Sequence, residues 1–220
     1  MLPKLDFKPA EAAAFWQLKL MQVAEFEAIA EKWLGEGLGD TELAVAAFGL
    51  PEARLDAEPI VEKALAELGV STFSQKQLAW LAIHSAHARL LDTRWPTYEA
   101  ARIIVQIAYD FEETPLFDGQ DPLMKHVRET PPHNKDPNRM FAGEQCRVNG
   151  IYWAYYSKDD YSYNWSFNSN EEGVDYGTFV KRVEREVNLN IISEAEVSWK
   201  NYFCLSAKVP DEYEELKTYL

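Results

Sequence analysis

The sequence predicts an α+β protein, in which a helical amino-terminal domain precedes a smaller domain that combines an antiparallel sheet with helices. Three observations support this class: apolar residues recur at helical spacing over 9–111, five prolines fall within 112–147, and polar and apolar residues alternate in the last third. We therefore expect an α-helical domain over 1–129, a proline-rich connector over 130–147, and an α+β domain of β-β-α-β-α order over 148–220.

The first predicted helix begins at Pro9, a position where the missing N–H of proline is harmless. Apolar side chains then step by three and four residues, which places them on one face of a single long helix that ends before Gly35. The apolar residues of this face are Phe15, Leu18, Phe26, Ile29 and Trp33, and the polar Gln22 occupies the remaining position of the spacing.

Local start and stop signals predict four further helices in the amino-terminal domain. Thr41, Ser74 and Thr97 are N-cap candidates, and Gly69 is a stop signal. In the last of these helices apolar residues cover most of the circumference, so we expect neighbours to pack on it from several sides. The expected limits are about 41–48, 56–68, 75–91 and 98–111.

The carboxy-terminal domain is expected to start with a hairpin of two strands, over 148–157 and 161–168. In the second strand four aromatic residues alternate with Ser and Asn, so the period of two places all four rings on one face. A helix is then expected from Asp175, a third strand over about 197–209, and a final helix from Pro210-Asp211.

The charge of the chain limits its partners. There are 36 acidic and 22 basic residues, for a formal net charge of −14, and both halves are acidic. This surplus argues against nucleic acid and against anionic membranes, and no run of about 18 uncharged apolar residues predicts a membrane span. It favours a basic protein partner, although solubility alone also explains it.

The cysteines and the amino terminus predict a cytoplasmic protein. Cys146 and Cys204 are the only cysteines and form no CxxC pair, and the first residues lack the basic-then-apolar pattern of a signal peptide. Isolated thiols without an export signal fit a reducing compartment. A disulfide between the two would require both to lie in the small sheet, and this is left open.

The most unusual feature is a set of eight aromatic residues within the sixteen positions 152–167. About half of them should fill the core under the hairpin, and the others should be exposed, as Tyr and Trp often are at protein interfaces. The plainer explanation is that all of them are core. The predicted partner-binding residues are Tyr152, Tyr156, Asp159, Asp160 and Tyr161.

An alternative site would combine Cys146 with His126 and His133, in or beside the connector. A thiol and an imidazole can act as nucleophile and base, but no nucleophile motif surrounds Cys146. His84 and His87, at i and i+3 of one predicted helix, could both face a metal ion. Their apolar neighbours favour a helix contact instead, so no metal and no cofactor is predicted.

Together these observations predict a non-catalytic binding protein that engages a basic protein partner, for example an inhibitor or immunity protein against a nuclease toxin. Phosphate-binding glycine loops and the GxSxG motif of serine hydrolases are absent. Two alternatives stay open. One is an enzyme or small-ligand protein with its site between the two domains, and the other is a carbohydrate-binding surface on the aromatic hairpin.

Overall fold

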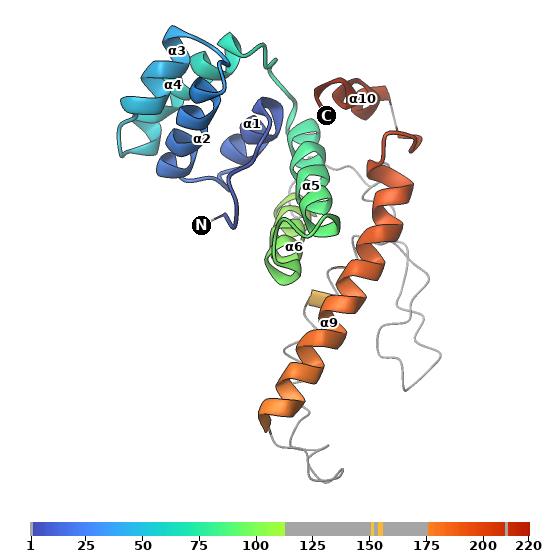
Figure 1. Ribbon diagram of the computed structural model, residues 1–220. Helices are drawn as coiled ribbons and strands as arrows, with labels where there is room; N and C mark the ends of the chain where they lie inside the picture. The colour runs from blue at the N-terminus through green and yellow to red at the C-terminus, as the bar shows by residue number, and fades with distance from the viewer. Residues whose placement is uncertain (1, 113–150, 152–153, 156–175, 210) are drawn as a thin grey trace. The chain divides into compact units, whose positions relative to one another are not determined.

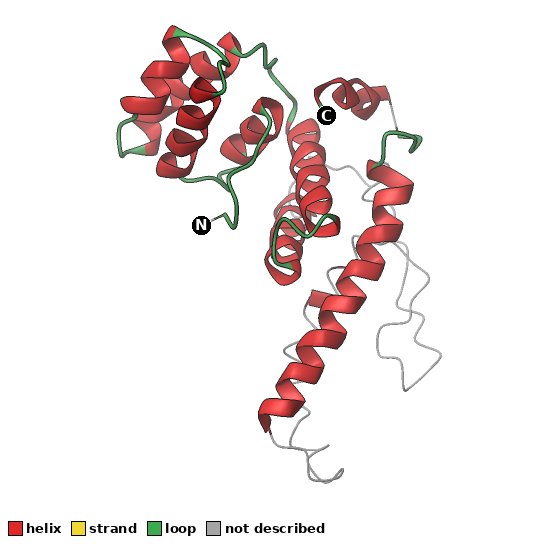
Figure 2. Cartoon of the chain, viewed as in Figure 1, coloured by secondary structure: helices red, strands yellow, loops and turns green. Residues whose placement is uncertain are grey.

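The computed structural model describes residues 2–112, 151, 154–155, 176–209 and 211–220 (Figure 1). Within these residues the regular secondary structure is helical and no β-strand occurs (Figure 2). The prediction of an α+β protein is therefore wrong for the part of the chain that is described. No helix in that part has a stretch long and apolar enough to cross a lipid bilayer.

The chain folds into two compact units. The first comprises Met1–Ser85 and Pro210–Leu220, and the second comprises Ala86–Val209. The division falls inside helix α5 (Gln75–Leu91), so this helix contributes residues to both units. The predicted connector over 130–147 lies outside the described residues, and the predicted domain limits stay a prediction.

The first predicted helix is in fact two helices, α1 (Pro9–Gln17) and α2 (Val23–Gly35). Helix α1 begins at Pro9 as expected, but Lys19 has a left-handed backbone conformation, with φ 60°, that interrupts the helical path. A new helix start follows, where the Gln22 backbone N–H donates to Glu25 Oε2 at 2.7 Å. The apolar spacing continues across the break, and for this reason periodicity alone predicts one helix.

Helix α1 is the central helix of the first unit. All residues from Ala10 to Trp16 are buried, and four of them are alanines, which allow neighbouring helices to approach closely. Ring contacts extend this core along α2: Phe26 lies between Trp16 and Trp33, with centroid distances of 5.4 Å and 6.1 Å. Trp33 Nε1 donates to the Phe7 carbonyl at 3.0 Å, which fixes the segment before α1.

Helices α3 (Thr41–Phe48) and α4 (Arg54–Glu67) continue the helical bundle of this unit. Helix α2 packs on α3, α3 packs on α4, and α4 also contacts α1. Both helices lie within two residues of their predicted limits, and Gly69, with φ 75°, follows α4 as the predicted stop.

Arg54, the first residue of α4, joins that helix to the break between α1 and α2. Its Nη1 donates to the Met21 carbonyl at 2.8 Å, and its Nη2 donates to the Trp16 carbonyl. The guanidinium carbon lies 3.8 Å from the centroid of the Trp16 ring. Partial burial lowers the pKa of Arg54, while the Glu58 carboxylate acts in the opposite direction. Arg54 thus supplies donors where the helical hydrogen-bond pattern stops.

The carboxy-terminal segment also belongs to the first unit. It forms α10 (Asp211–Glu214) and a 3₁₀ helix, η2 (Glu215–Tyr219), so the predicted final helix is confirmed. Tyr213 and Leu216 are buried, and the Tyr213 ring stacks on Trp80 with a centroid distance of 6.0 Å. The segment therefore adds two side chains to the core of this unit.

Hydrogen bonds tie α10 to the start of α5. Ser74, the predicted N-cap, accepts from the Gln77 backbone N–H at 3.2 Å and donates to Glu212 Oε1 at 3.1 Å. Gln77 Nε2 also donates to the Glu212 carbonyl at 3.2 Å. Ser74 and Glu212 are 138 positions apart, so this contact joins distant parts of the sequence.

In the second unit, α6 (Thr97–Glu112) contacts the long helix α9 (Tyr176–Ser198). The apolar residues of α6 between Ala100 and Ile107 are buried, as the sequence predicts for a central helix. The buried positions of α9 recur every three or four residues, which defines the face that it turns to the core. They are Val183, Val187, Ile191, Ala195 and Ser198.

The strand predicted over about 197–209 is wrong. Helix α9 continues to Ser198, and a π-helix, η1 (Trp199–Phe203), follows it. The helical spacing of buried residues extends to the end of α9, and Phe203 is buried against His87 with a ring centroid distance of 4.7 Å. Polar and apolar residues alternate in 197–209, but the segment is helical where Phe203 packs against His87 of α5.

The strand predicted over 148–157 is wrong where it is described. Ile151, Ala154 and Tyr155 are helical. Ile151 and Ala154 are three positions apart and both are buried, which is helical spacing, and the Tyr155 ring stacks on Tyr98 with a centroid distance of 4.5 Å. The strand predicted over 161–168 lies outside the described residues.

Replacing Arg54 with alanine should lower the free energy of unfolding by about 1.5–3 kcal/mol, because charge-assisted hydrogen bonds to two carbonyls are lost. Chemical denaturation followed by tryptophan fluorescence measures the change. The control is Lys63→Ala, which removes an exposed positive charge from the same helix and should change stability by less than about 0.5 kcal/mol. Equal effects of the two substitutions would contradict the role given to the Arg54 hydrogen bonds.

Replacing Tyr213 with alanine should lower the free energy of unfolding by about 3 kcal/mol, the usual cost of removing a buried aromatic ring. It should also shift tryptophan emission to longer wavelength, because water reaches Trp80. Glu215→Ala, at an exposed position of η2, is the control and should have an effect below about 0.5 kcal/mol. An unchanged unfolding midpoint for Tyr213→Ala would show that α10 is dispensable for this core.

Candidate functional site

The predicted partner-binding residues and the alternative site both lie outside the part of the chain that the structure describes, so both stay predictions. The first set consists of Tyr152, Tyr156, Asp159, Asp160 and Tyr161, and the second of His126, His133 and Cys146.

His84 and His87 are both buried on α5, and each contacts an aromatic ring. The His84 ring stacks on Trp80, with centroids 5.3 Å apart and planes inclined by 22°, and His87 lies against Phe203. In the described ranges, no group of three or more His, Cys, Asp or Glu side chains is placed to hold a metal ion. Both histidines therefore take part in ring contacts, and the expectation that they bind no metal stays a prediction.

Two further buried polar residues, Arg89 and Ser198, lie in the second unit. The guanidinium carbon of the buried Arg89 is 5.5 Å from the centroid of the Trp95 ring. Ser198 is also buried, directly before the π-helix η1, and π-helical turns are frequent at functional sites. Among the described residues, however, Ser198 Oγ has no hydrogen-bond partner, so no base is placed to activate it.

The exposed apolar side chains of the first unit gather around α3 and α4. Phe48 is 69% exposed and Leu55 is 82% exposed, while Val45 and Leu38 are 45% and 40% exposed. In the described part of this unit, these are the only large apolar side chains with such exposure. We call these four residues the α3–α4 patch. Exposed large apolar side chains on two neighbouring helices are a feature of interaction surfaces.

Helix α3 is apolar on both its inner and its outer face. The inner face is buried through Leu43 and Ala47, and the outer face carries Val45 and Phe48, which are one turn apart. Glu42 is the only charged residue of the helix and is half-buried. A helix that is apolar all round is normally enclosed on every side. The outer face of α3 is therefore suited to be covered by another molecule.

Contacts at its N-terminus fix the orientation of α3. The Leu43 backbone N–H donates to Glu67 Oε2 of α4 at 2.8 Å. Hydrogen bonds from the backbone of Asp40 and of Leu43 lower the pKa of Glu67. Gly39 precedes the helix with φ 65°, and a Cβ added there would lie 2.9 Å from Leu43, so the position requires glycine.

Acidic side chains surround the α3–α4 patch. Residues 36–67 contain eight acidic and two basic residues, and one of the two basic residues, Arg54, is bonded to backbone carbonyls. Glu52, Asp56 and Glu62 are exposed, and none of them forms an ion pair with any residue that the structure describes. These three unpaired carboxylates therefore give the surface around the patch a negative electrostatic potential.

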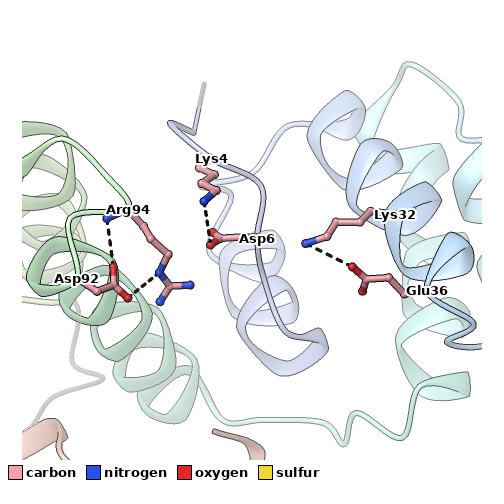
Figure 3. Close-up of polar contacts among 6 residues, drawn as sticks. All are labelled: Lys4, Asp6, Lys32, Glu36, Asp92 and Arg94. Atoms are coloured by element: carbon pink, nitrogen blue, oxygen red, sulfur yellow. Dashed lines mark hydrogen bonds and ion pairs between the residues drawn. The ribbon is translucent and has the colours of Figure 1, made fainter.

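Three surface carboxylates elsewhere have local partners (Figure 3). Lys32 Nζ lies 3.7 Å from Glu36 Oε1, one turn apart on α2, and Arg94 Nε lies 2.6 Å from Asp92 Oδ2. In the segment before α1, Lys4 Nζ lies 4.0 Å from Asp6 Oδ2. Exposed pairs of this kind contribute little to stability, but they reduce the local charge. The unpaired carboxylates near α3 and α4 differ from them in this respect.

A backbone acceptor is also left open beside the patch. Pro59 lies inside α4 and has no N–H, so it cannot donate to the carbonyl of Leu55 as a residue at that helical position normally does. Leu55 is the most exposed apolar residue of the patch. The first turn of α4 thus combines an apolar side chain, a carbonyl without its helical donor and the neighbouring Asp56 carboxylate.

A signal for the α3–α4 patch exists in the sequence. The segment Thr41–Phe48 carries one charged residue and apolar side chains at both inner and outer helical spacing, and glycines flank it on both sides. A short helix of this composition indicates either a fully enclosed position or an interface. Only the exposed fractions of Val45 and Phe48 distinguish the two cases.

Comparison with protein-family models, with curated proteins and with solved structures found no match to this chain.

Replacing Glu67 with glutamine should lower the melting temperature at neutral pH and have less effect in acid. The pKa of Glu67 is lowered in the folded chain, so the ionised carboxylate stabilises the fold above its unfolded pKa, and this contribution is lost as the pH falls through the folded pKa. Thermal unfolding between neutral and acidic pH measures the difference. The control is Glu62→Gln on the same helix, which should have the same melting temperature as the unmodified chain at each pH. A difference that is independent of pH would contradict the capping role of Glu67.

Proposed function

We propose that the chain is a non-catalytic binding protein that engages a basic protein partner. The observation that carries the proposal is the α3–α4 patch, in which exposed apolar side chains lie among carboxylates without ion pairs. Apolar contact area supplies affinity at protein interfaces, and charge complementarity supplies specificity and a fast encounter. The patch offers both on one pair of helices.

The distribution of charge supports this class of partner. Residues 1–85 and 210–220, which form the first unit, contain 17 acidic and 8 basic residues, whereas residues 86–209 contain 19 and 14. The unit that carries the patch is therefore the more strongly negative of the two. Such a field attracts a basic protein and repels nucleic acid and anionic lipid.

A specific form of the proposal is an inhibitor or immunity protein that neutralises a nuclease toxin. The surface of a nuclease is basic where it binds phosphates, and an acidic inhibitor reaches it rapidly through electrostatic steering. Such an inhibitor would act in the cytoplasm, where it protects the nucleic acid of the cell. The rate of association, more than the final affinity, is then the property on which function depends.

The alternatives predicted from the sequence are an enzyme or small-ligand protein using His126, His133 and Cys146, and a carbohydrate-binding surface on the aromatic segment 152–167. Both depend on residues outside the described part of the chain. They stay predictions, and no contact among the described residues favours them over protein binding.

The proposal predicts a partner that is basic and whose association rate depends strongly on salt. The full chain captures proteins from the lysate of its host, mass spectrometry identifies the bound protein, and the partner is then produced in pure form. Stopped-flow measurements should show that the association rate falls about tenfold or more between about 0.02 M and 0.5 M salt, because salt screens the steering field.

Two outcomes would contradict the proposal. One is a specific partner that is acidic or neutral and associates at a rate that salt does not change. The other is the absence of any reproducible partner together with a metal ion or small molecule that raises the melting temperature, which would favour the small-ligand alternative.

A further inference from the structure

We infer that the α3–α4 patch binds an amphipathic basic helix of the partner protein. Apolar side chains of that helix cover Val45, Phe48 and Leu55, and its Lys or Arg side chains bind near Glu52 and Asp56. The inference rests on the proposed function and names the structural class of partner that it requires.

The spacing of the exposed apolar side chains matches the length of a helix. Val45 and Phe48 lie one turn apart on the outer face of α3, and Leu55 follows Phe48 by seven residues. Seven residues span at most about 25 Å even when fully extended. A helix of about 18 residues is about 27 Å long, so it can contact both α3 and the first turn of α4 at any separation that the chain permits.

A helix fits this surface better than an extended segment does. An extended segment that binds as an added β-strand needs a sheet edge for its backbone N–H and C=O groups, and no strand occurs in the described ranges. A helix satisfies its own backbone and presents only side chains. Apolar residues at i, i+3, i+4 and i+7 would then form the face that covers the patch.

The polar groups around the patch are acceptors, which determines the charge of the partner helix. The exposed carboxylates of Glu52 and Asp56 accept hydrogen bonds from ammonium or guanidinium groups. The carbonyl of Leu55 is a further acceptor, because Pro59 leaves it without a helical donor. Lysine and arginine side chains match all three groups, whereas an acidic helix would meet only repulsion.

Two other occupants are disfavoured by the same charges. A second copy of the chain would bring two acidic surfaces together, with Glu52 and Asp56 on both sides of the contact. A membrane with anionic headgroups would be repelled by the same carboxylates. Self-association through the apolar side chains and binding to a neutral lipid surface are outcomes that the experiment distinguishes.

The test uses the full chain and two synthetic peptides made of Leu and Lys. One is about 18 residues long and ordered so that one helical face is apolar and the other is basic, and the second has the same composition in scrambled order. Dissociation constants are measured by fluorescence anisotropy at several salt concentrations. The ordered peptide should bind at least about tenfold more tightly than the scrambled one.

The apolar part of the contact is tested by the double substitution Phe48→Ser with Leu55→Ser. It should weaken binding of the ordered peptide at least about tenfold. The matched control is Leu189→Ser with Leu205→Ser, which removes two exposed leucines from the second unit and should leave the dissociation constant unchanged.

The acidic part is tested by Glu52→Gln with Asp56→Asn. This pair should weaken binding at low salt and reduce its salt dependence. The control is Glu186→Gln with Glu196→Gln, two exposed carboxylates of α9, which alters net charge equally and should have a smaller effect.

Pro59→Ala tests the open carbonyl without threatening the fold. Alanine restores the N–H that bonds to the Leu55 carbonyl, so it should raise the melting temperature while weakening binding about two- to fivefold. A loss of binding in a more stable variant cannot result from unfolding. Unchanged binding would remove the Leu55 carbonyl from the contact.

The inference is overturned if the two serine double variants bind the ordered peptide equally well, since binding would then depend on overall charge alone. It is also overturned if Phe48→Ser with Leu55→Ser abolishes a concentration-dependent dimer or binding to phosphatidylcholine vesicles, which would identify a second copy or a lipid as the occupant. In each case a captured basic partner with salt-dependent association still supports the proposed function. If no basic protein binds the chain at all, the proposed function fails as well.

Discussion

The contact between Arg54 and the carbonyls at the α1–α2 break determines how the first unit is arranged. The chain between Gln17 and Val23 leaves the helical path, and a guanidinium from α4 supplies donors there while its flat face lies on the Trp16 ring. This contact places the start of α4 against the end of α1. From its other end α4 extends Glu67 to the N-terminus of α3. Two side chains of one helix thus hold the central helix on one side and the exposed apolar helix on the other.

The sequence predicts the helices of the first unit well where the signals that begin and end them are local. Pro9, Ser74 and Gly69 act through their own backbone or the next turn, so a single sequence contains the information. The prediction fails at Lys19, because the break is completed by a residue 35 positions later, and at 197–209, because Phe203 packs against α5. Polar and apolar residues can alternate over a few positions at the end of a helix as well as in a strand. A contact with a residue distant in sequence then distinguishes the helix from the strand.

The acidic surroundings of the α3–α4 patch could be predicted from composition, but the position of the patch could not. An apolar residue in a core and one in an interface have the same chemistry, so Val45 and Phe48 are indistinguishable from Leu43 until accessible area is known. The aromatic segment 152–167 is the stronger signal in the sequence, and the predicted binding surface lies in it. Apart from Ala154 and Tyr155, that segment lies outside the described residues. Helix α3 gives a weaker signal, which is the lack of charge on a short surface helix.

The return of α10 and η2 to the first unit has a consequence for how the protein is made. Tyr213 and Leu216 complete a core whose other members precede Ser85, and the whole of Ala86–Val209 is translated between them. At about 5–20 residues per second, the ribosome takes roughly 6–25 s to cover that interval. During this time Phe73 and Trp80 lack the rings that later cover them, and the nascent chain offers an aromatic surface to chaperones. The first unit therefore receives its last core side chains only after the whole of the second unit has been translated.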